Sequence, residues 1–170
     1  AEDLKVLNVM WDCGTERVLE DKRHKYVVRT QANATTEMVA TVLYLLKTQP
    51  KFSTIAVVNQ DYAWGRDSWD IFLNTLKALK PDVKVVAGMF PKFGASDFST
   101  EISRLQALRP AVILNTSWGG DLDTFVRQAS QRGCSRKAQP WCYLWLKVHW
   151  SDWAALYLKA LSWALAETIT

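Results

Sequence analysis

The sequence lacks the short motifs by which several common activities are recognised. It contains no GxGxxG, GxxxxGKS/T, GxSxG or HExxH pattern. Dinucleotide binding, P-loop phosphate binding, serine hydrolysis and zinc peptidase chemistry therefore lose their usual signatures. Only two histidines occur, and the three cysteines, Cys13, Cys134 and Cys142, show no CxxC spacing. We expect no metal site and no cofactor, and we leave open whether Cys134 and Cys142 form a disulfide.

Neither sign of charge dominates the sequence, and long hydrophobic runs are absent. Lys and Arg number 21 against 17 for Asp and Glu, and the excess is scattered. The longest basic run, residues 21–25, is interrupted by His24 and is interpreted as a solvated loop. A nucleic-acid partner is therefore not expected. No run is long enough to span a bilayer, and the first residues do not have the pattern of a signal peptide.

What is present is a repeated succession of strand, loop and helix between residues 53 and 133. Residues 53–59, 83–90 and 111–116 are short and rich in Val and Ile, and each precedes a helical pattern. They are typical of buried parallel strands. The helices are expected at residues 62–79, from about 97 to 109, and from about 120 to 133. In the first of these, core packing explains a stripe on one face that consists of Trp69, Phe72, Leu73, Leu76 and Leu79. With 170 residues, of which 49% are hydrophobic, the chain predicts one α/β domain.

The residues before position 53 predict two more strands and one helix. Residues 4–10 and 26–30 are strand-like, and a polar loop separates them. Residues 33–47 predict a helix with a broad buried face, which includes Val39, Leu43 and Leu46. Asn33 or Thr35 can cap this helix, and Pro50 ends it.

Three loops are expected at one edge of the sheet, because ligands in open α/β sheets bind beyond the carboxyl ends of the strands. These loops are residues 60–65, 91–97 and 117–121. They carry Asp61, Asp97 and Asp121, from which an acid and base pair could be drawn. Asp97 and Asp121 stand where a carboxylate caps a helix, so capping is favoured over catalysis. For Asp61, a structural role in the loop and a ligand contact both remain open.

Aromatic residues in the same loops indicate a pocket. Tyr62, Trp64 and Trp118 belong to no helical stripe, so they could wall a small ligand. The hydroxyls of Ser96, Thr116 and Ser117 and the neighbouring backbone amides could then hold its polar end. The alternative for any one ring is packing against a neighbouring loop.

With these residues in view, the chain resembles the type I periplasmic solute-binding proteins of ABC transporters, of the leucine/isoleucine/valine-binding class. The matching segments are residues 26–30, 55–66, 93–102, 105–114 and 125–133. The resemblance implies two doubly wound α/β lobes, each a mostly parallel sheet with helices on both faces, that clamp a solute between them. Residues 1–30 would then be the end of the first lobe and a hinge crossing, and residues 31–133 the second lobe. By position, the residues that would face the cleft are Asp61, Tyr62, Trp64, Phe93, Thr116, Ser117 and Trp118.

The resemblance also implies a function. A member would capture a branched-chain amino acid, an amide or a similar small solute in the periplasm and deliver it to a membrane permease, without catalysing a reaction. One alternative is a ligand-sensing domain of a regulator or receptor with the same fold. A second is a small α/β enzyme that uses Asp61 with Asp97 or Asp121. Fold alone does not separate these hypotheses.

Residues 134–170 differ in character, because four of the nine tryptophans lie between residues 134 and 153. With one cytosine restored after the Gly133 codon, a permitted choice of codons encodes an amphipathic helix, then a Val/Ile strand that ends in glycine. We therefore hypothesise that this tail is translated in a shifted frame. The alternative is a genuine tail with a strand at residues 141–148 and a helix at residues 151–168.

Overall fold

A computed structural model describes residues 1–133 of the chain. Its elements follow the predicted order of strands and helices, except for the four-residue helix α1, which lies in the predicted polar loop. They are β1 (Asn8–Met10), α1 (Arg17–Glu20), β2 (Val27–Arg29), α2 (Ala34–Thr48), β3 (Thr54–Val58), α3 (Ala63–Leu79), β4 (Lys84–Met89), α4 (Ser99–Leu108), β5 (Val112–Leu114) and α5 (Gly119–Gln131).

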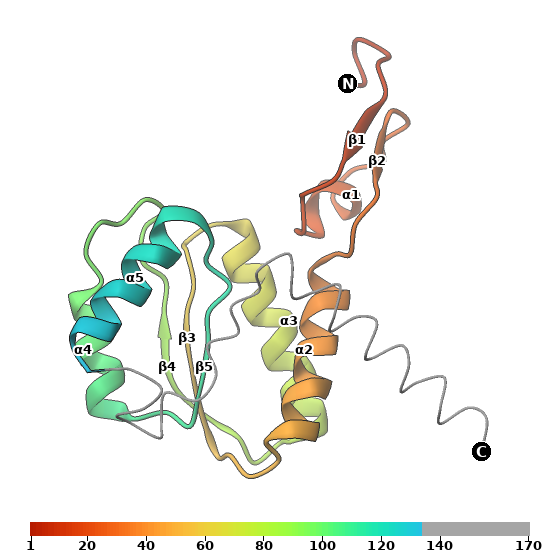
Figure 1. The fold of residues 1–170 in the computed structure, drawn as a ribbon. Helices are drawn as coiled ribbons and strands as arrows, with labels where there is room; N and C mark the ends of the chain where they lie inside the picture. The colour runs from red at the N-terminus through yellow and green to blue at the C-terminus, as the bar shows by residue number, and fades with distance from the viewer. Residues whose placement is uncertain (134–170) are drawn as a thin grey trace.

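The main sheet consists of β4, β3 and β5 in that order, and all of its strands are parallel. Side chains alternate along the central strand β3, as the period of a strand requires. Ile55 and Val57 join the hydrophobic cluster on one face, while Ala56 and Val58 join the cluster on the other. Helices α2 and α3 cover the first face, and α4 and α5 cover the second (Figure 1). The expected doubly wound α/β fold is confirmed.

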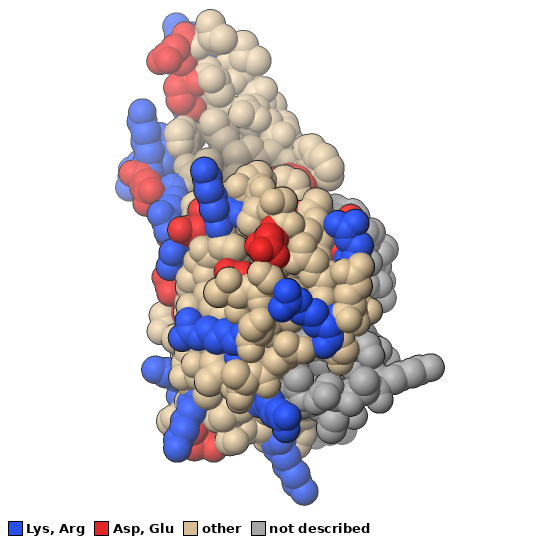
Figure 2. Space-filling model, turned by 90° about the vertical axis from the view of Figure 1, so that its left-hand side faces the viewer, with Lys and Arg blue, Asp and Glu red and all other residues tan. Residues whose placement is uncertain are grey.

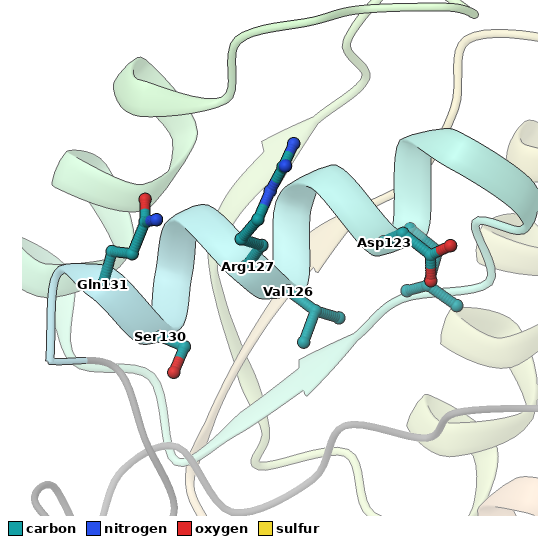
Figure 3. A pocket seen from close by; sticks show the side chains of 6 residues that line it. Asp123, Val126, Arg127, Ser130 and Gln131 are labelled. Carbon is teal, nitrogen blue, oxygen red and sulfur yellow. The ribbon is translucent and has the colours of Figure 1, made fainter.

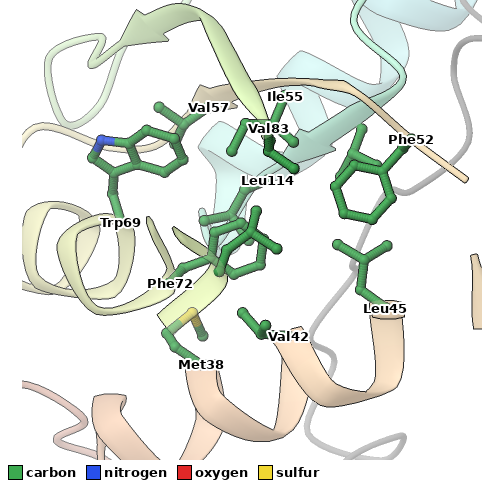
Figure 4. Packing of buried hydrophobic residues seen from close by; sticks show 12 residues of the cluster. Met38, Val42, Leu45, Phe52, Ile55, Val57, Trp69, Phe72, Val83 and Leu114 are labelled. Atoms are coloured by element: carbon green, nitrogen blue, oxygen red, sulfur yellow. The ribbon is translucent and has the colours of Figure 1, made fainter. Parts of the chain in front are cut away.

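The face covered by α2 and α3 holds the larger cluster of buried side chains (Figure 4). The apolar stripe predicted on α3 is confirmed for Trp69, Phe72 and Leu76, which are at most 8% exposed, but not for Leu79 at the helix end, which is 53% exposed. On α2 the buried residues are Met38, Val42 and Leu45, whereas Leu43 is 53% exposed. The predicted face of α2 was therefore too broad. The side that meets α3 and the sheet is centred on Val42.

Helix ends agree with the predicted caps in part. The Asn33 side chain caps α2, because its Oδ1 accepts a hydrogen bond from the Thr36 amide at 3.0 Å. Asp97 accepts from the amide and the hydroxyl of Ser99, the first residue of α4. Gly133 follows α5 with a φ of 76°, as expected for a glycine just beyond a helix end.

The second face is built from α4 and α5. Phe98 and Phe125 meet edge to face at 5.5 Å between ring centroids, and both are nearly fully buried. Ile102, Leu105 and Ala129 complete the helical contribution to this cluster. On the outer surface of this side of the molecule, Lys and Arg are spread among uncharged and acidic residues (Figure 2).

Strands β1 and β2 form a separate, two-stranded parallel sheet in an arm made by residues 1–31. The arm projects from the main body beside the upper ends of α2 and α3 (Figure 1). A carboxylate on α3 attaches it: Asp67 accepts from the Thr15 hydroxyl at 2.6 Å and from Arg17 Nε at 2.9 Å. Glu16 also accepts from the Thr35 amide, at 2.8 Å. The base of the arm is thus hydrogen-bonded to α2 and α3.

Several predictions concern residues outside the described part of the chain. The shifted frame, the strand at 141–148, the helix at 151–168 and the disulfide between Cys134 and Cys142 all fall there. Within residues 1–133, Cys13 is a free thiol. Of the helices in this range, none combines the length and the apolar character that crossing a membrane requires.

Candidate functional site

The three predicted loops meet at the carboxyl edge of the main sheet. The Asp61 amide donates to the Pro91 carbonyl at 2.9 Å, which joins the loop after β3 to the loop after β4. Asp121, in the first turn of α5, accepts from Gln60 Nε2 at 2.8 Å and from the Gly94 amide at 2.9 Å. One carboxylate therefore connects all three loops, and their expected position on one edge is confirmed.

Three aromatic rings, one from each loop, come into contact at this edge and form what we call the aromatic wall: Tyr62, Phe93 and Trp118. The Phe93 ring centroid lies 5.5 Å from that of Tyr62 and 5.8 Å from that of Trp118. Phe93 is 49% exposed and Trp118 is 55% exposed. The wall is thus an apolar surface at the place where this fold binds ligands.

A hydrogen bond fixes two of these rings. Trp118 Nε1 donates to the Tyr62 hydroxyl oxygen at 2.6 Å. Burial is the main cause that raises the pKa of Tyr62, and the nearby charges of Asp12 and Asp121 raise it further, against the lowering effect of the Trp118 hydrogen bond. The phenol therefore stays protonated at neutral pH and keeps its own O–H as a donor.

Trp64 belongs to a different contact. Its indole Nε1 donates to the Thr116 carbonyl at 3.1 Å. Its ring lies against Gly14 of the arm, so closely that a Cβ on Gly14 would lie 2.1 Å from the ring. Trp64 therefore links the arm to the loop after β5, instead of lying on the aromatic wall.

Thr116 and Ser117 lie at the end of β5. Thr116 is 5% exposed, and its hydroxyl lies 3.1 Å from the Ser68 hydroxyl. The Thr116 amide donates to Asn59 Oδ1 at 2.8 Å. Ser117 is half-buried, and its amide donates to Asn115 Oδ1 at 2.8 Å. Thr116 thus packs beneath the edge, and Ser117 lies between it and the aromatic wall.

Asp61 is exposed and pairs with Arg66 on the first turns of α3. Arg66 Nε donates to Asp61 Oδ1 at 2.8 Å, and this hydrogen bond lowers the pKa of Asp61. The Arg66 guanidinium also stacks on the Phe90 ring, 3.8 Å from its centroid. Asp61 is therefore ionised at neutral pH and already has a cationic partner.

Gln60 and Asn59 are the residues that reasoning from the sequence missed. Gln60 is 2% exposed, and its amide group contacts Asp121 and the backbone of Trp118. Asn59 is fully buried, donates to the Gly65 carbonyl at 2.9 Å and accepts from Thr116. Two amide side chains directly after a buried strand were the available signal, because buried polar groups need partners.

Two surface hollows lie away from the aromatic wall. One runs along α5 and is lined by Leu122, Asp123, Val126, Arg127, Ser130 and Gln131 (Figure 3). The other lies between α1 and α3, where Glu16, Arg17 and Asp67 are among its lining residues. None of the predicted site residues lines either hollow. Both hollows therefore lie apart from the predicted site.

The periplasmic binding protein family model matches residues 5–166 of the sequence. The chain belongs to this family. No curated protein sequence matches it. The α/β body described above is one lobe of the type I fold of this family, which confirms the resemblance noted from residues 26–133.

Solved structures of binding proteins resemble this family member in fold. One is an amino acid ABC transporter substrate-binding protein from Pseudomonas fluorescens Pf-5, with a TM-score of 0.70, 15% identity, and coverage of 81% of this chain and 36% of that chain. Another, from Rhodopseudomonas palustris HaA2 with p-hydroxybenzoic acid, has a TM-score of 0.69, 22% identity, and coverage of 81% and 36%. A branched chain amino acid ABC transporter from Thermus thermophilus with bound valine has a TM-score of 0.63, 14% identity, and coverage of 78% and 34%. The chain spans about a third of the length of these structures.

Proposed function

We propose that this family member is part of a solute-binding protein that captures a small solute in the periplasm and delivers it to the membrane permease of an ABC transporter. Residues 31–133 would form the second lobe, and residues 1–30 the end of the first lobe and the hinge crossing. The observation that carries the proposal is the aromatic wall at the carboxyl edge of the sheet, in a chain that belongs to a family of binding proteins. Closure of the first lobe over this edge would bury the solute between the two lobes.

The ligands of structural relatives set the range of solutes to consider. One relative was solved with bound valine, and others were solved with benzoate, 4-hydroxybenzoate or 3,4-dihydroxybenzoic acid. All of these are small molecules with one carboxylate. A branched-chain amino acid, an amide or an aromatic acid therefore remains within the proposed solute class.

The partners of the three carboxylates at the edge of the sheet speak against the alternative hypothesis of an α/β enzyme. Asp61 pairs with Arg66, and Asp121 is held by Gln60 and Gly94. Asp97 accepts two hydrogen bonds from Ser99, and these lower its pKa. Each carboxylate thus has a structural partner, and the pKa values of Asp61 and Asp97 are lowered, which is opposite to the shift that suits a general acid. This supports binding without catalysis.

A thermal-shift titration tests the proposal. The 170-residue chain is heated with each of several solutes at millimolar concentration, with leucine, valine and benzoate in the panel. A solute that binds only the folded chain raises Tm in a concentration-dependent manner. The control is Phe93→Ala, which removes a half-exposed ring of the aromatic wall and should reduce the shift. If no small carboxylate raises Tm, or if Phe93→Ala leaves the shift unchanged, binding at this edge is refuted.

A further inference from the structure

The two edges of the main sheet differ in character. β4, at one edge, has features that hinder pairing with a further strand. Lys84 is exposed, and the register with β3 shifts so that Val86 opposes no residue of β3. β5, at the other edge, consists of Val112, Ile113 and Leu114, which are uncharged and at most 6% exposed. β5 therefore resembles an interior strand of a larger parallel sheet more than an edge strand.

The backbone of β5 can accept a further strand. The Ala111 amide points toward β3, because it donates to Thr54 Oγ1 at 3.0 Å. Backbone groups point to alternate sides along a strand, so those of Ile113 also face β3, and those of Val112 and Leu114 face the opposite side. In the described part of the chain, β5 pairs with β3 alone. A strand beside β5 would therefore bond to Val112 and Leu114.

The crossovers within the sheet determine where the next parallel strand belongs. The connection from β3 to β4 passes over the face covered by α3, and the connection from β4 to β5 passes over the opposite face through α4, across β3. Such connections are right-handed in about 98% of cases. α5 covers the same face as α4, so a right-handed connection through α5 must continue in the direction from β4 to β5. The next strand is therefore expected at the open edge of β5.

The chain also leaves α5 at the end of the sheet where such a strand would begin. α5 starts beyond the carboxyl end of β5 and runs back along the sheet, so Gly133 lies toward the amino ends of the strands (Figure 1). Seven residues, 134–140, then connect Gly133 to Trp141. An extended chain of that length spans up to about 23 Å, and packed layers lie roughly 10 Å apart. Residue 141 can therefore reach the amino end of a strand beside β5.

Residues 141–148, WCYLWLKV, are the first strand-like segment after Gly133. Aromatic residues and Val favour strands, and all of these residues except Lys147 are apolar or aromatic, as in a strand that is buried on both faces. Pro140 precedes the segment, at a position where its missing amide does not interrupt a ladder. We propose that residues 141–148 form a strand parallel to β5 and extend the main sheet at this edge. The chain carries these residues whichever reading frame encodes them.

The proposed strand would bring two more side chains to the candidate site. Parallel strands end at the same edge of a sheet, so His149 and Trp150, which follow residue 148, would lie at the edge that carries the aromatic wall. Their neighbour there would be the loop of residues 117–121, since this loop follows β5. The extended sheet would thus supply a further loop to the edge, whatever solute the site binds.

Hydrogen-exchange and NOE measurements on the isotopically labelled 170-residue chain test the proposal. Neighbouring strands lie about 4.8 Å apart, so NOEs are expected between backbone protons of β5 and those of residues 141–148. The amides of Val112 and Leu114 should exchange as slowly as that of Ile113, to within about tenfold, because they too would be hydrogen-bonded. Neither measurement requires a ligand or a substitution.

Two proline variants separate strand pairing from simple burial. Leu144→Pro removes an amide in the middle of the proposed strand and should make Val112 and Leu114 exchange about tenfold or more faster. Ala138→Pro, in the connection before the strand, is the matched control and should leave both rates unchanged. The amide of Ile113 should stay slow in both variants, which would show that the α/β body remains folded.

Three outcomes would overturn the proposal. The first is free exchange of Val112 and Leu114 together with no NOE to residues 141–148. The second is protection that rises with chain concentration, with NOEs between differently labelled chains, because a second copy would then occupy the edge. The third is unchanged protection in Leu144→Pro; if this variant unfolds, the NOEs of the original chain decide. None of these outcomes bears on the proposed solute-binding function, which the thermal-shift titration tests separately.

Discussion

Gly65 offers the clearest test of how the loops at the sheet edge are built. It is buried in the first turn of α3, and a Cβ added to it would lie 2.0 Å from the Gln60 carbonyl oxygen. Ordinary contacts of this kind begin at 3.4 Å, so the backbone would have to move by 3.4 − 2.0 = 1.4 Å. Gly65→Ala therefore forces the start of α3 away from the end of β3.

Three contributions determine how much Gly65→Ala lowers the free energy of unfolding. Overpacking against rigid backbone destabilises by about 1–3 kcal/mol. Displacement also weakens the hydrogen bond from Asn59 Nδ2 to the Gly65 carbonyl, a loss of about 1 kcal/mol. Alanine is favoured over glycine within a helix by about 1 kcal/mol, which offsets part of this. We therefore expect Gly65→Ala to lower the free energy of unfolding by about 2 kcal/mol in total.

Gly120→Ala is the matched control. Gly120 is also in the first turn of a helix, α5, but a Cβ there would have no neighbour within 4 Å. We expect it to stabilise the chain by about 0.5 kcal/mol through helix propensity alone. Urea denaturation followed by far-UV circular dichroism measures both changes. If Gly65→Ala is as stable as Gly120→Ala, the close packing of α3 on the Gln60 carbonyl is wrong.

Three further predictions concern a carboxylate of α2, the attachment of the arm and the exposed surface of the arm. Burial, with a smaller effect of the Asp12 charge, raises the pKa of Glu37 to about 7 from the ordinary 4.5. The folded chain therefore binds this proton more tightly than the unfolded chain does. As the pH rises from 4.5 to 7, the contribution of Glu37 to the free energy of unfolding falls. Glu37→Gln should therefore be more stable than the original chain by about 1–2 kcal/mol at about pH 8 and equal to it at about pH 4 in urea titrations; equal stability at both would contradict the shift. Asp67→Asn weakens the bonds that hold the arm, so trypsin should cut after Arg17 several-fold faster, and an unchanged rate would show that other contacts hold this segment. Leu7 is 61% exposed on the arm, so Leu7→Glu should reduce self-association in light scattering, unless the original chain is already monomeric.

The features that the sequence predicted well are those that depend on local patterns. Val and Ile runs located the parallel strands, and the stripe of Trp69 and Phe72 located the buried face of α3. The gathering of Tyr62, Phe93 and Trp118 also followed from a simple rule. Parallel strands end at the same edge, so residues one or more loops apart in the chain become neighbours there.

The features that the sequence did not predict depend on individual side-chain partners. Asp121 was expected to cap α5, but its carboxylate reaches Gln60 and Gly94 in the two other loops. The packing of the Trp64 ring on Gly14, about fifty positions earlier in the chain, was also not predicted, and whether Trp64 faces the cleft stays a prediction. Hydrophobic period and helix propensity carry no information about such pairs, because the partners are distant in sequence and each residue had several plausible roles.

The position of Trp64 connects the arm to the edge of the sheet. The ring rests on Gly14, and its Nε1 donates to the carbonyl of Thr116, two residues before the wall residue Trp118. Any change in the angle of the arm that displaces Gly14 must therefore move Trp64 or break its hydrogen bond at the end of β5. A side chain at Gly14 would have the same effect from the other direction, since its Cβ would overlap the indole. One side chain thus links the arm to the end of β5, two residues before the aromatic wall, so the position of the arm and the position of this strand end depend on each other.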